Sequence, residues 1–352
     1  MTLDIAIRGI VPPDETAIQL AWQRWDSIAK PLRSLGLLEE ALARIAGMTG
    51  TPEIDLSRRA VAVFCADNGV VQEGVTQTGQ EVTAVVTENL SKGDTSVCRM
   101  AQVAHADVFP VDIGVARDVT GEKILHRKIA YGTQNMVNGP AMTREQAIQA
   151  LETGIQLALE LKENGYQILA TGEMGIGNTT TSSAITAVFL RLPPEQVTGR
   201  GAGLSSEGLK KKIQAIERAI AINQPDCNDA VDVLCKVGGL DLAGLAGVFL
   251  GGALARIPVV VDGFISAAAA LAAVRLCPFV KGYLLASHVS SEPAGRLLMR
   301  ELELQPFITA NMSLGEGTGA VAALPILDMA CAVYNGMRTF EQIEIAPYQP
   351  LA

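Results

Sequence analysis

The chain has 352 residues, of which 49% are hydrophobic and 18% charged, and its formal net charge is −9. This composition is sufficient for a large buried core and excludes a disordered chain. The acidic balance and an aromatic content of only 4% argue against nucleic-acid binding, which needs basic patches and stacking surfaces. No signal-sequence pattern opens the chain, and its longest uncharged run, 174–190, carries Asn178 and many hydroxyl groups. We therefore expect a cytoplasmic protein that does not enter a membrane.

Cysteine and histidine are too dispersed to suggest a metal centre. The six cysteines include no C-x-x-C pair, and the three histidines lie far apart in the sequence. We therefore expect reduced cysteines in the core and no zinc site.

Two helical patterns open the chain, at 17–28 and 36–46. Short apolar runs that end in turn residues then predict buried parallel strands at 60–66, 106–113, 166–170, 257–261 and 282–286. Helical periodicity occupies the intervals, at 81–90, 144–164, 179–190, 207–223, 267–276 and 293–302. This alternation predicts an α/β fold with an open, mostly parallel, Rossmann-like sheet and helices on both faces. Ligands bind at the carboxyl ends of the strands in such sheets, so the turns after the strands are the candidate sites.

The segment 238–273 is dense in alanine and glycine. Small residues at helical spacing allow helices to approach closely. We expect tight helix packing there, either within the chain or at a subunit interface.

The strongest local signal is the glycine-rich turn 171–181, between a predicted strand and a predicted helix. Gly175 and Gly177 allow backbone N–H groups to approach a ligand without a Cβ in the way. Asn178 or Thr179 is expected to cap the helix, whose positive N-terminal end favours an anion such as phosphate. The turn is neither a P-loop nor a dinucleotide fingerprint, because no Gly-Lys-Ser/Thr follows and the third glycine is missing. An ordinary glycine-rich turn remains the alternative.

Two further segments carry candidate groups. In 287–293, Ser290 or Ser291 is expected to cap a helix, and a second anion cradle or simple capping fits this pattern equally well. Glu316 stands among the glycines of 314–319, which suits a carboxylate that projects toward a substrate. In an apolar cleft such a glutamate has a raised pKa and can act as a general base, and a loop glutamate in water is the alternative.

Three more carboxylates, those of Asp67, Glu173 and Asp262, follow predicted strands. Strand ends of a parallel sheet meet at one edge, so these side chains are expected to converge on the same crevice. Each of them alone equally suits a capping role.

Ordered motifs spread over nearly the whole chain match one known family. They lie at 30–31 with 34–36, 66–70 with 73–75, 172–180, 201–204 with Lys212, 238–239, 261–263, 287–293 and 314–320. Together they resemble the nicotinate-nucleotide:dimethylbenzimidazole phosphoribosyltransferases of cobamide lower-ligand assembly. No adjacent aspartates occur, which argues against phosphoribosyltransferases that use a pyrophosphate-activated ribose.

The resemblance implies transfer of ribose 5-phosphate from nicotinate mononucleotide to a lower-ligand base, with release of nicotinate and with no metal or organic cofactor. It implies that Glu316 removes the proton of the attacking base, while Glu173 orients the ribose or stabilises an oxocarbenium-like transition state. The leaving pyridinium is already cationic and needs no general acid. The phosphate and ribose positions that it implies are Gly175, Gly177, Asn178, Thr179, Lys212, Ser290, Ser291 and Gly315.

The acceptor positions that it implies are Thr78, Val86 and Leu314. Family members that take dimethylbenzimidazole commonly place a serine and a glutamine at the first two. Val86 offers no amide, so a benzimidazole nitrogen loses a hydrogen-bond partner there. We therefore hypothesise an altered acceptor, with phenol or p-cresol as candidates beside a benzimidazole. Relatives that activate phenolics work as paired paralogues, so a heterodimer with a paralogous subunit stands beside the usual homodimer.

The resemblance also implies a large α/β catalytic domain at 56–329 and a small helical domain built from 1–55 and 330–352. Two rival interpretations differ in function. One is a supporting or non-catalytic paralogous subunit, which the presence of Glu316 and Glu173 disfavours. The other is a nucleotide-dependent dehydrogenase, which the absence of a G-x-G-x-x-G fingerprint disfavours.

Overall fold

The computed structural model describes residues 1–348 and places six strands in one sheet, in the order β3-β2-β1-β4-β5-β6. Every pairing between neighbouring strands is parallel, which confirms the predicted α/β class. The strands are β1 (Arg59–Ala66), β2 (Ala106–Gly114), β3 (Leu125–His126), β4 (Ile168–Met174), β5 (Val259–Val261) and β6 (Leu284–Ala286). β1 and β4 are apolar and almost entirely buried, as expected for central strands covered on both faces.

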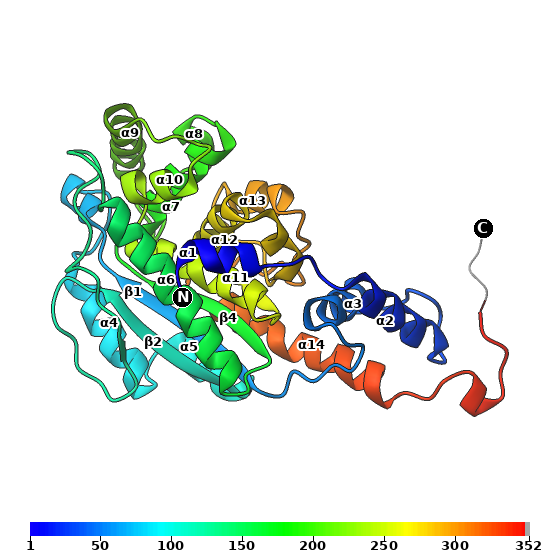
Figure 1. Cartoon of the computed structure of the whole chain (residues 1–352). Coiled ribbons are helices and arrows are strands. Elements are labelled where there is room, and N and C mark those ends of the chain that lie inside the picture. Colours follow the sequence, from blue (N-terminus) through cyan, green and yellow to red (C-terminus); the bar gives the residue numbers. More distant parts are fainter. Residues whose placement is uncertain (349–352) are drawn as a thin grey trace.

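Helices connect the strands and cover both faces of the sheet (Figure 1). Those before and between the first strands are α1 (Leu3–Gly9), α2 (Glu15–Ser27), α3 (Leu37–Thr49), α4 (Glu81–Lys92), α5 (Ser96–Val103) and α6 (Arg144–Glu163). After β4 come α7 (Asn178–Leu190), α8 (Pro194–Val197), α9 (Ser206–Asn223), α10 (Ala230–Val237) and α11 (Leu240–Leu254). The last are α12 (Phe264–Leu276), α13 (Gly295–Glu301) and α14 (Thr318–Gly336).

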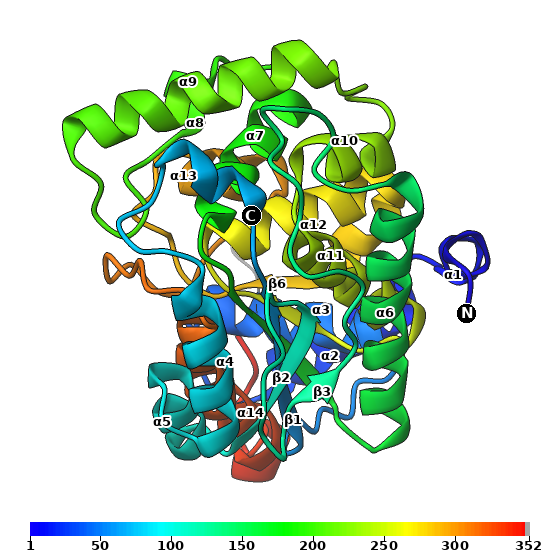
Figure 2. The same cartoon turned by 90° about the vertical axis from the view of Figure 1, so that its left-hand side faces the viewer.

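The two faces of the sheet carry different helices (Figure 2). α4, α5 and α14 pack on one face, and α6 and α11 pack on the other. α11 lies directly against α6, because a Cβ at Gly154 or Gly247 would collide with the backbone of the facing helix. The predicted tight packing of the alanine- and glycine-rich segment is therefore confirmed within the chain, and α11 is buried by helices of its own chain instead of by a partner.

The N-terminal helices divide between two places. α2 and α3 pack together and lie beside the far end of α14, where Trp25 meets Tyr334 with ring centroids 5.0 Å apart (Figure 1). α1 instead packs on α6 and α11, beside the sheet. The predicted division at 330 falls inside α14, and residues 349–352 of the predicted helical domain lie outside the described residues. The two-domain division stays a prediction.

α14 is the one helix of residues 1–348 that is long and apolar enough, by length and composition, to cross a membrane. It packs against α3, α5 and β4, and its Asp328 accepts a hydrogen bond from Arg59 Nη1 at 2.9 Å. These contacts identify α14 as a core helix of the fold.

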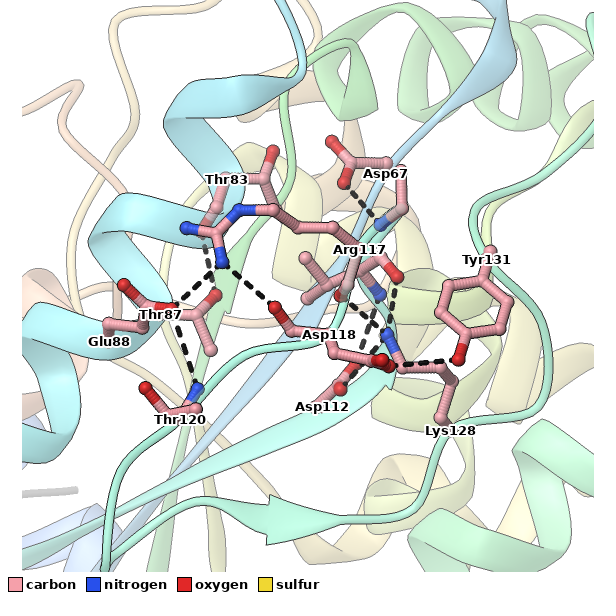
Figure 3. A network of polar contacts seen from close by, with 12 residues as sticks. Asp67, Thr83, Thr87, Glu88, Asp112, Arg117, Asp118, Thr120, Lys128 and Tyr131 are labelled. Carbon is pink, nitrogen blue, oxygen red and sulfur yellow. Dashed lines mark hydrogen bonds and ion pairs between the residues drawn. The ribbon is translucent and has the colours of Figure 1, made fainter.

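A polar network ties the long loop after β2 to the strand ends (Figure 3). Lys128 Nζ lies 3.1 Å from Asp112 Oδ2 and donates to the carbonyls of Val115 and Arg117. Asp67 Oδ2 accepts from the Ala116 amide at 2.7 Å. Asp67 thus holds this loop, and it is not among the residues that line the cavity described below, so the expectation that it joins the other strand-end carboxylates there is wrong.

Candidate active site

The strand order places the site. The chain moves outward from β1 to β2 and β3 on one side, and from β4 to β5 and β6 on the other. A crevice opens at such a switch point, outside the carboxyl ends of the central strands. A cavity of about 290 Å³ lies there. The predicted residues that line it are Thr78, Val86, Glu173, Gly175, Gly177, Asn178, Thr179, Ser290, Leu314, Gly315 and Glu316. Of the site residues that the family resemblance implies, Lys212 and Ser291 do not line it, and neither does Asp67.

The turn from β4 into α7 forms one wall of the cavity. Gly177 is the N-cap of α7 with φ 95°, a left-handed conformation that side chains rarely adopt. The prediction that Asn178 or Thr179 caps the helix is wrong, because no side chain caps α7. Asn178 lies inside the helix and donates its amide to Glu173 Oε2 and to Asp241 Oδ2, the latter at 3.0 Å. The tertiary carboxylates outcompete the local capping bond.

Lys212 lies just behind this wall. Its Nζ donates to Thr179 Oγ1 at 2.8 Å and to the carbonyl of Gly199 at 3.2 Å. The side chain is buried, and burial lowers its pKa to about 8, although Glu292 opposes the shift. Thr179 lines the cavity, so Lys212 stands one side chain away from the space where a ligand binds.

The turn before α14 also lines the cavity. Glu316 has φ 62° and stands between Gly315 and Gly317, whose φ values are 88° and 95°. Its carboxylate Oε2 accepts from the Val97 amide, in the first turn of α5, at 3.3 Å. Burial raises the pKa of Glu316, and the hydrogen bond from Val97 opposes that rise. The turn also touches β4, because a Cβ at Gly172 would collide with the Glu316 carbonyl.

Asp262, at the end of β5, holds this second turn in place. Its carboxylate accepts from the Gly317 amide at 3.2 Å and from the Ala320 amide at 2.9 Å. Burial raises the pKa of Asp262, while neighbouring His288 opposes the shift. Asp262 lines the cavity as well. The expected convergence of strand-end carboxylates is thus confirmed for Glu173 and Asp262.

Glu173 is a buried acid of the cavity wall, and burial raises its pKa well above the usual range. Its acidic neighbours Asp241, Asp262 and Glu316 add to the rise, and the hydrogen bond from Asn178 opposes it. Within residues 1–348 no group of three or more His, Cys, Asp or Glu side chains is arranged to hold a metal ion.

The segment 287–293 contributes differently from the prediction. α13 begins only at Gly295, with Ala294 as its N-cap, so neither Ser290 nor Ser291 caps that helix. Ser290 lines the cavity, and its hydroxyl accepts from the Glu292 amide at 3.3 Å. Ser291 is exposed and donates its amide to the Met312 carbonyl.

The three predicted acceptor positions all line the cavity, and two of their side chains are apolar. Val86 is half-buried on α4, and Leu314 is 60% exposed on the turn before α14. Thr78 supplies the hydroxyl of this trio.

The residues near the cavity that escaped the sequence reasoning include two with charged side chains. Arg200 lines the cavity and donates to the Leu204 carbonyl and the Ser206 hydroxyl. Asp241 lies one contact behind the wall, near the start of the otherwise apolar helix α11. The sequence does contain one indication of Asp241, because it is a single acidic residue at the start of an apolar run.

Comparison with known proteins places the chain in a family. A family model described as phosphoribosyltransferase matches residues 10–345. The chain is 47% identical, over the full length of both proteins, to a nicotinate-nucleotide–dimethylbenzimidazole phosphoribosyltransferase of Clostridium acetobutylicum. It is 49% identical to the one of Acetivibrio thermocellus, over 95% of each chain. The crystal structure of CobT from Thermus thermophilus superposes with a TM-score of 0.90 at 40% identity, covering 94% of this chain and 99% of that one. The chain therefore belongs to the phosphoribosyltransferase family that these relatives represent.

Proposed function

We propose that this protein transfers ribose 5-phosphate from nicotinate mononucleotide to a cobamide lower-ligand base and releases nicotinate. The observation that carries the proposal is that two glycine-built turns, one suited to a phosphate and one bearing a half-buried glutamate, line the same cavity. The names of the relatives agree with this substrate pair.

The phosphate end of the cavity is assigned to the start of α7. No protein group of residues 1–348 accepts a hydrogen bond from the amides of Gly177 and Thr179, which lie at the positive end of the helix. Such amides suit an anionic phosphate. Lys212 adds a cation behind Thr179, and Ser290 and Gly175 border the same space. Ser291 is assigned to the rim, because its side chain is exposed.

Glu316 is assigned as the general base. An acceptor that attacks C1′ of the ribose loses a proton as the new bond forms, and a carboxylate beside the cavity can take it. The raised pKa makes Glu316 a stronger base than a solvated glutamate, while the Val97 amide keeps the ionised form accessible. Gly315 and Gly317 permit the left-handed turn that aims it.

Glu173 is assigned to the ribose. Its burial favours the neutral form in the free protein, whereas a cationic pyridinium or an oxocarbenium-like ribose favours the carboxylate. The charge on Glu173 therefore stabilises the reacting centre once the pyridinium nitrogen of the substrate is in place.

A second acceptor class is supported by the three acceptor positions. Val86 and Leu314 present hydrocarbon where a benzimidazole nitrogen would gain from an amide, and Thr78 keeps one hydroxyl. We propose that phenol and p-cresol are accepted beside benzimidazoles. A competition assay that yields only the benzimidazole riboside would reject the phenolic part of this proposal and leave the transfer itself intact.

We also propose a cytoplasmic dimer without nucleic-acid or membrane partners, as either a homodimer or a heterodimer with a paralogous subunit. Support comes from large apolar side chains that are exposed near the cavity and on neighbouring helices, among them Val85, Leu314, Val103 and Met329. Native mass spectrometry of the purified chain, alone and with its paralogue, separates the two assemblies.

The decisive experiment is incubation of the purified chain with nicotinate mononucleotide and a panel of benzimidazoles, purines and phenols, read by mass. We expect a ribosyl-phosphate adduct of at least one acceptor and an equal amount of nicotinate. Turnover only after addition of a paralogous chain would favour the supporting-subunit alternative. A nicotinamide absorbance change with an alcohol substrate would favour the dehydrogenase alternative.

A further inference from the structure

Asp241 is a buried acid that the assigned reaction does not use. It is fully buried near the start of α11, and its Oδ1 has no hydrogen-bond partner within residues 1–348. A position in the first turn of a helix stabilises a carboxylate in part. Burying a charge with an unpaired oxygen still costs free energy. The position therefore calls for an explanation beyond capping.

One amide joins Asp241 to the cavity wall. Asn178 Nδ2 donates both to Asp241 Oδ2, at 3.0 Å, and to Glu173 Oε2. An asparagine amide has two N–H groups, so each carboxylate receives one of them. Asn178 and Glu173 are both buried, so water does not compete strongly for these bonds.

The same line of contacts continues to the turn that carries the general base. Glu173 Oε1 lies 2.5 Å from the point where a Cβ on Gly315 would stand. The carboxyl group of Glu173 is thus held between the amide of Asn178 and the backbone of Gly315. Asp241 fixes the Asn178 amide from behind.

The groups around the pair are acidic. Glu173 faces Asp262 and Glu316, Asp241 faces Asp67, and the thiol of Cys65 lies close to both carboxylates. No lysine or arginine of residues 1–348 forms an ion pair with either member. Burial raises the pKa of Asp241 to about 6 and also raises the pKa of Glu173 well above its usual range, and a neutral amide cannot balance two charges.

We propose that Asp241 is a positioning residue of the transfer reaction: through Asn178 it holds Glu173 beside Gly315, and the Asp241–Glu173 pair keeps one proton that leaves when the pyridinium nitrogen of the nucleotide comes to lie beside it. In that step a carboxyl O–H bond breaks, the proton passes to solvent, and both members are ionised against the pyridinium. The inference rests on the proposed function for the identity of the nucleotide.

Calorimetry of the wild-type protein tests the proton step directly. Nicotinate mononucleotide and ribose 5-phosphate are each titrated near pH 6.5 in buffers of different ionisation enthalpy, which gives the protons released per ligand. The two ligands share the phosphate and its contact with Lys212, and they differ in the cationic ring. We expect nicotinate mononucleotide to release more protons, by up to about one per site. Equal proton counts for the two ligands would overturn the proposal.

Variants test the positioning role. Asp241→Asn keeps an acceptor for Asn178 and removes one negative neighbour of Glu173. We expect a smaller proton release, kcat within about threefold of wild type, and an acid limb of kcat/KM moved to lower pH. Asp241→Ala leaves the amide without its anchor, and we expect kcat to fall about tenfold.

Asp67→Asn is the matched control, because Asp67 is an equally buried acid of the same group that touches neither Asn178 nor the cavity. Asp67 acts on Asp241 only through its charge, so this variant should change the proton count less than Asp241→Asn does. A lower melting temperature in the Asp241 variants with an unmoved acid limb would reduce Asp241 to a structural residue and overturn the proposal. Failure of the proposed function has a different signature, in which the proton difference persists and no ribosyl product forms.

Discussion

The two glycine turns that border the cavity have nearly the same backbone conformation at their N-cap glycines, but the amides of those glycines have different hydrogen-bond partners. Gly177 begins α7 with φ 95° and ψ −10°, and Gly317 begins α14 with φ 95° and ψ 10°. Neither helix has a side-chain cap of its own. At α14, however, the carboxylate of Asp262 accepts from the Gly317 and Ala320 amides, whereas at α7 no carboxylate of residues 1–348 takes that place.

This difference makes the start of α7 suitable as an anion site and the start of α14 suitable as a support for Glu316. The positive end of α14 is satisfied by a protein carboxylate, so its turn is fixed and can aim Glu316. The positive end of α7 faces the cavity with amides free for a ligand. The same local conformation therefore serves as an anion site at α7 and as a fixed support at α14. The residue that makes the difference is Asp262, which follows β5.

The largest expected effect comes from the tip of the α14 turn. Glu316→Gln keeps the acceptor for the Val97 amide and removes the base. We expect kcat to fall by roughly 10²–10⁴-fold with little change in the KM of nicotinate mononucleotide. Steady-state kinetics with a saturating acceptor measure both constants. Wild-type kcat in this variant would remove the base assignment.

The support itself is tested by Asp262→Ala, which leaves two buried amides at the start of α14 without an acceptor. We expect kcat to fall about 10–100-fold because the turn no longer holds Glu316 in place. Asp262→Asn retains one acceptor oxygen, so its kcat should lie between that of Asp262→Ala and that of the wild type. If KM rises and kcat is unaffected, Asp262 binds the nucleotide instead of supporting the turn.

Alanine at each N-cap glycine compares the two turns directly. Both residues have positive φ, so each change costs about 1–2 kcal/mol of conformational free energy. Gly177→Ala also brings a Cβ to 2.9 Å from Val71 and disturbs the free amides, so we expect the KM of the nucleotide to rise about tenfold. Gly317→Ala should lower kcat instead. Identical kinetic changes in the two variants would contradict the division of roles.

The smallest effect is the pH dependence from Lys212. Its pKa of about 8 lies below the ordinary value of 10.5, so the free protein loses this cation as the pH rises through about 8. A phosphate binds the charged form better, and we expect the KM of the nucleotide to rise above pH 8, by at most about tenfold per pH unit. Lys212→Met should abolish this dependence, whereas Lys211→Met, at an exposed position paired with Glu207, should retain it. A KM that stays constant to pH 9.5 in the wild type would argue against Lys212 as a phosphate partner.

The strands and the long helices could be predicted because their apolar periodicity is local. The predicted strand at 60–66 and helix at 207–223 agree with β1 and α9 to within one residue. Short helices such as α5 and α10 were missed, since eight residues carry little periodicity. α14 was missed because its glycine-rich start and internal Pro325 interrupt the helical pattern, and packing on the sheet stabilises it nonetheless.

The site was predictable where one segment carries the signal and not where two segments meet. Glu316 among its glycines and the turn at 172–178 are visible in the sequence alone. The expected cap at Asn178 was wrong because Glu173 and Asp241 bind its amide, and no local rule reveals that competition. Likewise, the role of Asp262 depends on the strand order that sets β5 beside β4.

The cavity walls come from segments between Val75 and Glu316, so the site is completed only when almost the entire chain has been synthesised and folded. Arg59 of β1 also donates a hydrogen bond to Asp328 of α14, which ties the first strand of the sheet to the last α-helix. A chain that ends before Glu316 would retain the amides of α7 and lack the proposed base. Bound nucleotide should therefore raise the free energy of unfolding of the whole molecule, by about 2.7 kcal/mol at a nucleotide concentration of a hundred times its Kd. Only full-length, folded chains would gain this stabilisation.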